Sequence, residues 1–255
     1  MDQVYLPRNR QGFPLGGYVV VKPLESMHVT EKPHFYGIKE VAPLKLGIVQ
    51  EIFALISRHA HDCENVLITG SFLEEGFSFQ DIDVLIITDK EMNEKSLQKA
   101  IESSIKIEVH LLVMSHDALL KGLATDPLYH MMLSKAVAKK RFIYHVEREV
   151  DYKLLDLHLL KSRVLIDNFD SLNGNEKYSL VRNMVAIFEF IKGEKLRKEH
   201  VDKEIESIFQ VKVFTIRQNV LDKKTFLREF RGVYQKTLDL ILEGIRHDSK
   251  QKQAH

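Results

Sequence analysis

Hydrophobic and polar positions follow two different patterns along the chain, and the change comes near residue 150. Before it, short apolar runs bounded by turn residues predict strands, and apolar positions at helical spacing predict helices between them. The strands are expected at residues 65–70, 82–88 and 105–114, and the helices at 43–56, 91–104, 116–124 and from Pro127 onward. Beyond residue 151 the strand signals nearly vanish, so an all-helical part follows a mixed α/β part.

We therefore expect an α+β protein organised in four segments. Residues 1–42 are expected to form an N-terminal arm or hairpin, and residues 43–148 a mixed sheet flanked by helices. Residues 149–247 carry the patterns of about four helices and are expected to form a bundle, followed by a polar, disordered tail at 248–255.

Three short segments complete this expectation. The run at 18–24 has the β-branched composition of a strand, and the turn-rich run at 32–37 is expected to be a loop. Alternating apolar positions at 139–146 predict a short edge strand after the last helix of the mixed part.

Composition narrows the functional classes. Lys and Arg number 37 against 36 for Asp and Glu, which argues against a surface that follows a phosphate backbone throughout, although a local basic patch stays open. A single cysteine, Cys63, excludes a disulfide framework within the chain and favours a reducing compartment. No run reaches the ~20 apolar residues of a membrane span, and the N-terminus lacks the apolar stretch of a signal peptide, so we expect a cytoplasmic protein.

Two carboxylates interrupt the second predicted strand. Asp81 and Asp83 are two residues apart and point to the same face, whereas Ile82 and Val84 point into the core. Carboxylates held on one face repel each other, and a divalent cation offsets that repulsion. Oxygen ligands favour Mg²⁺ or Mn²⁺ over zinc, and Glu108, inside the apolar alternation of the next strand, is the expected third ligand.

A Gly-Ser turn precedes this pair. Gly70 permits close backbone approach, and Ser71 can donate a hydrogen bond to a phosphate oxygen. The order of hydrophobic strand, Gly-Ser, nine residues and Asp-x-Asp resembles the motif of the DNA polymerase β-like nucleotidyltransferase superfamily. The alternative, an acidic hairpin on a purely structural sheet, leaves all three carboxylates unexplained.

The resemblance implies a two-metal transfer of a nucleoside monophosphate. In that scheme Asp81, Asp83 and Glu108 hold Mg²⁺ against a nucleoside triphosphate, with ATP as the expected donor, and Gly70 and Ser71 cradle the triphosphate. Glu108 also helps to hold or activate the acceptor hydroxyl, which belongs to a small molecule, a protein or an RNA end. A homodimer is the expected assembly, because relatives with this plan often complete the site across a dimer.

The second half suggests a branch of the superfamily. A catalytic α/β domain followed by a helical bundle is similar to the kanamycin-type antibiotic nucleotidyltransferases, and also to the minimal nucleotidyltransferases. The former take a general base from a Phe-Glu-aromatic context, which makes Glu189 in "AIFEFIKGE" a candidate. A surface glutamate facing Lys192 across one helical turn is the alternative.

One feature departs from the family pattern. Members usually place an arginine near Gly-Ser to bind phosphate, whereas this chain has Glu74 and Glu75 there, which would repel a triphosphate unless cations from elsewhere compensate. The basic run 139–141 is one possible source, and an ordinary solvated turn is its alternative. The departure keeps one rival function open, a nucleotidyltransferase-fold binding or regulatory protein with little turnover. A second rival is an RNA-binding module that uses Arg8 and Arg10 of the arm together with the basic run 139–141.

Overall fold

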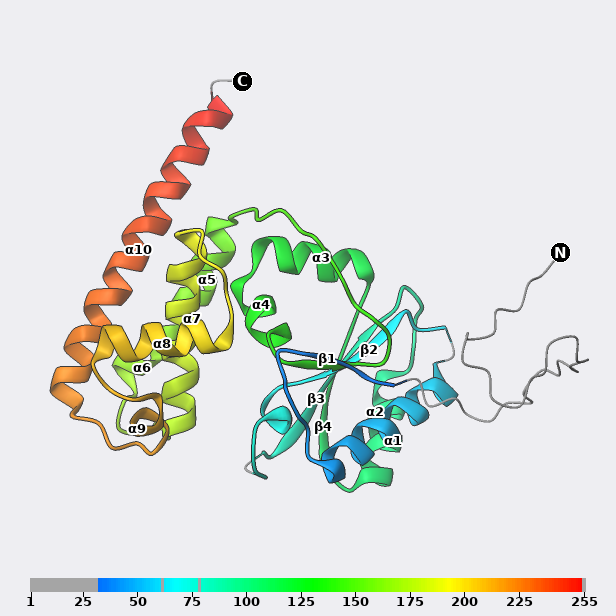
Figure 1. Ribbon diagram of the computed structural model, residues 1–255. Coiled ribbons are helices and arrows are strands. Elements are labelled where there is room, and N and C mark those ends of the chain that lie inside the picture. The colour runs from blue at the N-terminus through cyan, green and yellow to red at the C-terminus, as the bar shows by residue number, and fades with distance from the viewer. Residues whose placement is uncertain (1–31, 61, 78, 254–255) are drawn as a thin grey trace, which may run out of the picture. The chain divides into compact units, whose positions relative to one another are not determined.

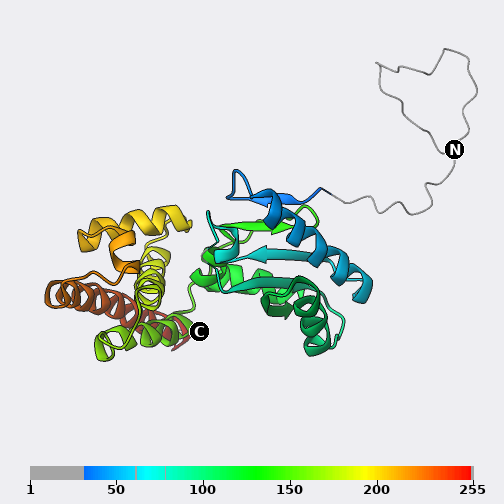
Figure 2. The ribbon, with the colours of Figure 1, turned by 90° about the horizontal axis from the view of Figure 1, so that it is seen from below.

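A computed structural model describes residues 32–60, 62–77 and 79–253, and the side chains up to residue 247. All of these residues belong to one compact unit that begins at Lys32. A five-stranded mixed sheet has the order β1-β5-β2-β3-β4, which Figure 2 shows from β1, in blue, at one edge. The strands are β1 (His34–Tyr36), β5 (Ala136–Ala138), β2 (Asn65–Thr69), β3 (Asp81–Ile87) and β4 (Glu108–Met114). Only the β3–β4 pair is parallel, and the protein is therefore of the α+β class expected.

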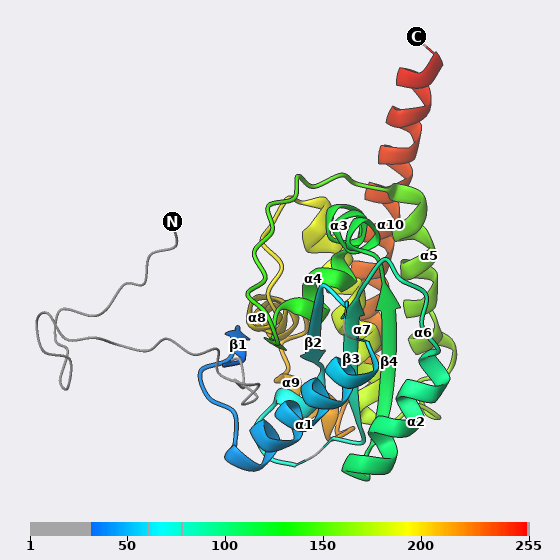
Figure 3. The same cartoon turned by 90° about the vertical axis from the view of Figure 1, so that its right-hand side faces the viewer.

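Two hydrophobic layers cover the sheet, and successive strand residues alternate between them. Ile82 and Val84 pack with the helices α1 (Pro43–His59) and α2 (Glu94–Ile105), which lie across one face in Figure 3. Leu85 packs on the other face with α3 (His116–Thr125) and the end of α4 (Pro127–Leu133). Asp81 and Asp83 share that second face by the same alternation.

Helix starts follow the local chemistry of the sequence. Pro43 occupies the first turn of α1, where its missing N–H loses no hydrogen bond. Asn93 caps α2 and Asp126 caps α4, each through a side-chain oxygen that accepts a backbone N–H. Asn173 and Glu176 form a reciprocal capping box at the start of α7 (Gly174–Ile191).

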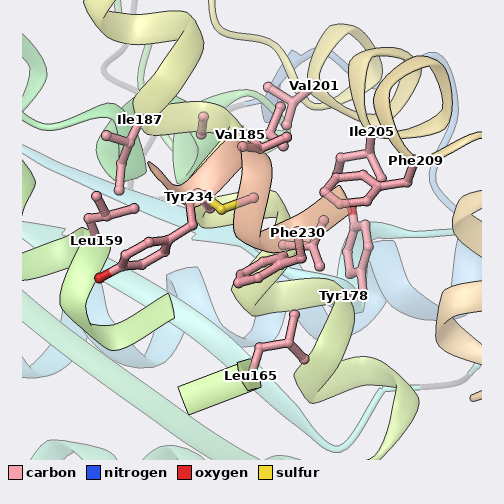
Figure 4. Close-up of a cluster of buried hydrophobic side chains, with 14 of the residues drawn as sticks. Leu159, Leu165, Tyr178, Val185, Ile187, Val201, Ile205, Phe209, Phe230 and Tyr234 are labelled. Atoms are coloured by element: carbon pink, nitrogen blue, oxygen red, sulfur yellow. The ribbon is translucent and has the colours of Figure 1, made fainter. Parts of the chain in front are cut away.

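The second half is all helical and has its own core. Its helices are α5 (Tyr152–Ser162), α6 (Val164–Asp167), α7, α8 (Lys198–Phe209), α9 (Val213–Arg217) and α10 (Lys223–Gln253), which Figure 1 shows lying together. Their apolar faces meet in one cluster that includes Val185, Phe209 and Phe230, drawn in Figure 4. The four helical patterns of the sequence are confirmed, but the first is divided into α5 and α6, and α9 was not expected.

Two predictions about the sheet are wrong. The last strand is Ala136–Ala138, not 139–146, and it lies between β1 and β2 instead of at an edge. Residues 139–146 alternate because Phe142 and Tyr144 pack on the hydrophobic layer while Ile143 is 73% exposed, and this extended segment makes no ladder. The expected loop at 32–37 contains β1, because residues 34–36 pair with the backbone of β5 and the Tyr36 hydroxyl accepts a hydrogen bond from the Phe142 amide at 2.6 Å.

The ends of the chain differ from expectation in one place. α10 continues to Gln253, through most of the segment 248–255 expected to be a disordered tail, because residues 245–253 contain no Gly or Pro to end the helix. The strand expected at 18–24, like most of the N-terminal arm, lies outside the described residues. Within the described part, no helix is long and apolar enough to cross a membrane.

Candidate functional site

The acidic pair lies at one end of the two central strands. Asp81 is the first residue of β3, and Asp83 faces Thr69, the last residue of the antiparallel strand β2. Ile82 and Val84 are buried on the opposite face, as the alternation predicted. The sheet therefore presents two carboxylates beside the turn that follows β2.

That turn fits closely around Asp83. Gly70 adopts φ +82° and ψ −163°, a backbone conformation open to glycine almost alone. A Cβ atom at position 70 would lie 2.0 Å from the Asp83 Oδ2 atom, so the carboxylate occupies the space that a side chain would fill. Ser71 then opens a 3₁₀ turn, η1 (Ser71–Leu73), and remains exposed.

The environment of Asp83 disfavours its negative charge. Burial raises the pKa of the Asp83 carboxyl, and the nearby charge of Asp81 raises it further. His110 on β4 has its Nδ1 atom 3.2 Å from Asp83 Oδ1, and this contact lowers the pKa of the Asp83 carboxyl. A cation bound between the two carboxylates would favour their charged forms.

Glu108 lies beside the pair but outside its pocket. It faces Asp81 across the parallel β3–β4 ladder, as its place on the next strand predicted. Its side chain is exposed at the start of an edge strand, although the apolar alternation around it suggested a buried position, so burial gives it no need for a bound cation. Among the described residues, no group of three or more His, Cys, Asp or Glu side chains is placed to hold a metal ion.

A cleft of about 830 Å³ opens in front of the Gly-Ser turn and the acidic pair. The sheet side supplies Gly70, Ser71, Asp81 and Asp83, and the other sides come from α4 and from the helical half. The polar residues of the helical half on this cleft are Asn175, Tyr178, Ser179, Arg182, Asn183, Lys198 and Arg217. The cleft thus joins the two halves of the chain around the predicted motif.

Cations compensate the acidic residue that follows the turn. Glu74 forms ion pairs with Lys198 and with Arg217, whose Nη1 atom lies 3.4 Å from Glu74 Oε2. Burial lowers the pKa of Lys198, and the neighbouring charge of Arg217 lowers it further. Lys135, also on the cleft, pairs with Glu199 at 3.3 Å. Positive charge, which the sequence lacks near Gly-Ser, is therefore present elsewhere on the cleft.

Tyr178 organises that wall. Its hydroxyl donates to Asp202 Oδ1 at 2.6 Å, and its ring lies in the bundle core, as Figure 4 shows. Burial and the Asp202 carboxylate raise the pKa of Tyr178 to about 12. The guanidinium of Arg217 lies 4.2 Å from the ring centroid and that of Arg182 lies 5.7 Å from it.

Glu189 is not brought to the cleft. Its side chain is 2% exposed, with Lys192 Nζ 3.1 Å and His200 Nε2 3.5 Å from its carboxylate oxygens. It does not line the cavity that holds Asp81 and Asp83. The alternative, a surface glutamate that faces Lys192, is correct about the contact with Lys192 but wrong about exposure, because Glu189 is buried.

The basic run 139–141 also lies elsewhere. Lys139 donates to Ser57 Oγ at 2.7 Å, Lys140 to the carbonyl of Cys63 at 3.3 Å, and neither lines the cleft. The cleft cations at 135, 182, 198 and 217 were not found from the sequence, because no motif surrounds them and only the packing of the helical half brings them to the motif. Arg8 and Arg10 are outside the described residues.

Comparison with known proteins adds no family. No protein-family model matches the chain, and no curated protein matches it significantly.

Proposed function

We propose that the cleft binds a nucleoside triphosphate with Mg²⁺ and that the protein transfers the nucleoside monophosphate to a hydroxyl group. The observation that carries this proposal is the meeting of Asp81, Asp83 and the Gly70–Ser71 turn with a cationic wall in one cleft. Among the cleft cations, Arg182 has no carboxylate partner in the described part of the chain, and a purely structural acidic hairpin does not explain its place on a cavity of about 830 Å³. In this proposal the protein is a DNA polymerase β-like nucleotidyltransferase, and β2, η1, β3 and the parallel β4 form its nucleotide-binding part. We propose that it acts in the cytoplasm.

The two aspartates fit a magnesium ion that is shared with a substrate. Mg²⁺ is usually bound in proteins by one or two carboxylates together with phosphate oxygens and water, so a group of three protein ligands is not required. Burial and the neighbouring Asp81 raise the pKa of Asp83, and a cation bound beside the two carboxylates would favour their charged forms. Asp81 and Asp83 would hold the ion, and its chemistry there is to neutralise charge on the phosphates.

The other residues of the cleft would bind and orient the substrates. Gly70 leaves room for the Asp83 carboxylate at the turn, and Ser71 is exposed there to donate a hydrogen bond to a phosphate oxygen. In the transfer, the acceptor oxygen forms a bond to the α-phosphorus while the bond to pyrophosphate breaks, and the hydroxyl proton passes to a base. Glu108 is nearer to this role than Glu189, because Glu108 faces Asp81 across the ladder.

Nucleotide binding without transfer is the second candidate. The exposed side chain of Glu108 and the ion-paired side chain of Glu189 favour it, because neither candidate base lines the cleft. Both functions require the same nucleotide site and differ only in turnover.

The experiment that separates them uses α-labelled nucleoside triphosphates with Mg²⁺ and three acceptor fractions: small molecules, proteins and RNA. Label that moves to one fraction with wild-type protein, and not with an Asp81→Asn plus Asp83→Asn variant, supports transfer. Nucleotide binding without label in any fraction supports the binding protein. Absence of nucleotide binding by folded protein overturns both.

A further inference from the structure

The helical wall of the cleft carries a polar stripe on α7. Asn175, Ser179, Arg182 and Asn183 follow one another at spacings of three to four residues or are adjacent, so they share a helix face, and all of them line the cleft. Polar residues on a face that fronts a cavity are free to contact a ligand, whereas the apolar face of α7 packs in the bundle core.

Two arginines on the helical wall of the cleft each have a buried nitrogen that lacks an acceptor among the described residues. The Nε atoms of Arg182 and Arg217 are buried and have no hydrogen-bond partner among the described residues. Arg182 also has no carboxylate partner in the described part of the chain, and its single side-chain hydrogen bond, from Nη2, goes to Asn183 Oδ1 at 3.2 Å. A buried charged donor without an acceptor is costly, and an anion bound in the cleft would supply the acceptor.

Tyr178 holds both arginines in place. Its ring lies beside each guanidinium, and its hydroxyl is fixed by Asp202. Planar arginine side chains oriented by an aromatic ring are suited to binding phosphate through paired N–H groups. Lys198 adds a third positive charge, which forms an ion pair with Glu74.

We propose that Arg182 and Arg217, oriented by Tyr178, form a phosphate-binding subsite in the cleft. The inference rests on the proposed function, because it assigns part of the same cleft, but it does not require Asp81, Asp83 or a metal. Two sources carry this chemistry: the polyphosphate tail of the donor nucleotide and a phosphate group on the acceptor.

Titration calorimetry with inorganic triphosphate in metal-free buffer tests the subsite. Wild-type protein is expected to bind, and Arg182→Gln and Arg217→Gln are each expected to weaken binding by about tenfold or more, the effect of losing a charged hydrogen bond. Arg231→Gln is the matched control, because Arg231 is exposed on α10 and does not line the cleft. Arg182→Lys, which keeps the charge, should recover part of the affinity. Thermal unfolding of each variant shows that it is folded.

The result that overturns the inference is an absence of triphosphate binding by wild-type protein, or equal binding by Arg182→Gln. The Asp81→Asn plus Asp83→Asn variant separates this failure from failure of the proposed function. It should retain triphosphate binding while it loses Mg²⁺-dependent nucleotide binding. Nucleotide binding that depends on the aspartates but not on Arg182 leaves the proposed function intact and refutes the subsite.

A further titration, with nucleotide, identifies the source of the phosphate. If Arg182→Gln weakens binding of a non-hydrolysable nucleoside triphosphate with Mg²⁺, the subsite takes the donor tail. If nucleotide affinity is unchanged but inorganic phosphate binds less well to nucleotide-saturated Arg182→Gln than to nucleotide-saturated wild type, the subsite takes a phosphate of the acceptor.

Discussion

Gly70 and Asp83 show how single residues define the acidic end of the cleft. The carboxylate of Asp83 occupies the position that a side chain at residue 70 would need, and the backbone of Gly70 has a conformation that other residues avoid. Each residue therefore constrains the other, although 13 positions separate them in the sequence. Gly76 provides a natural comparison, because it also has positive φ but has no atoms near its missing Cβ.

Gly70→Ala is expected to lower stability and nucleotide binding together, because the new methyl group displaces Asp83. Gly76→Ala introduces only the strain of positive φ, which is about 1–2 kcal/mol, and leaves Asp83 in place. Thermal unfolding and nucleotide titration of both variants measure the difference. Equal effects of the two substitutions on nucleotide binding would mean that the contact between Gly70 and Asp83 does not shape the site.

Residue types and spacing predicted one side of the cleft and missed the other. Asp81 and Asp83 could be placed together because strand periodicity fixes the direction of side chains two residues apart. Glu108 was predicted to face the pair and does so by register, but its exposure depends on β4 being an edge strand, which no local pattern states. Arg182 and Arg217 could not be found, because helical patterns describe which face is apolar and not what lies opposite the polar face.

At the scale of elements, α4 connects the sheet to the bundle through His130. The Nε2 atom of His130 lies 2.6 Å from the carbonyl oxygen of Leu123, and its ring lies 6.1 Å from that of Phe190 on α7. Burial holds the pKa of His130 below its usual value, and the positive charge of Arg148 acts in the same direction. The folded protein therefore keeps this imidazole neutral at a pH at which the unfolded chain protonates it.

The lowered pKa of His130 predicts how the stability of the protein depends on pH. Below the usual histidine pKa of about 6.5, the unfolded chain binds a proton that folded His130 does not, so the free energy of unfolding falls as pH is lowered. His130→Gln removes this contribution. Urea unfolding of both proteins at about pH 7.5 and about pH 5.5 should show a smaller loss in the variant. A larger loss in the variant would contradict the assignment.

Helices with a clear hydrophobic periodicity were predicted well from the sequence, and short strands were not. The helices α1, α2, α3 and α7 have both an apolar stripe and a capping residue or proline at the start, and the sequence located each of them. The strand β5 has three small apolar residues that a helix can equally contain, and its identity depends on hydrogen bonds to β1 and β2.

At the scale of the whole molecule, Glu74 joins the turn after β2 to the helical half. It contacts Lys198 on α8 and Arg217 at the end of α9, far from it in sequence. The pair is largely removed from solvent, so loss of the carboxylate leaves a partly buried cation without compensation. The same carboxylate competes with any anion that enters the proposed phosphate subsite.

Glu74→Gln is therefore expected to lower the free energy of unfolding by about 1–3 kcal/mol and to raise the affinity for inorganic triphosphate. Glu75→Gln removes an equal charge from the cleft, but no ion pair of Glu75 is present among the described residues, so smaller effects are expected. Thermal unfolding with and without triphosphate compares the two variants. Weaker triphosphate binding by Glu74→Gln would show that Glu74 positions the cations instead of competing for them.

The most direct measurement of the central claim is calorimetric titration of the wild-type protein with non-hydrolysable analogues of the four ribonucleoside triphosphates, with and without Mg²⁺. The account predicts binding that requires Mg²⁺ and that the Asp81→Asn plus Asp83→Asn variant loses while it remains folded. Binding of no nucleotide by folded wild-type protein, or equal binding by the variant, would contradict the assignment of this cleft as a nucleotide site.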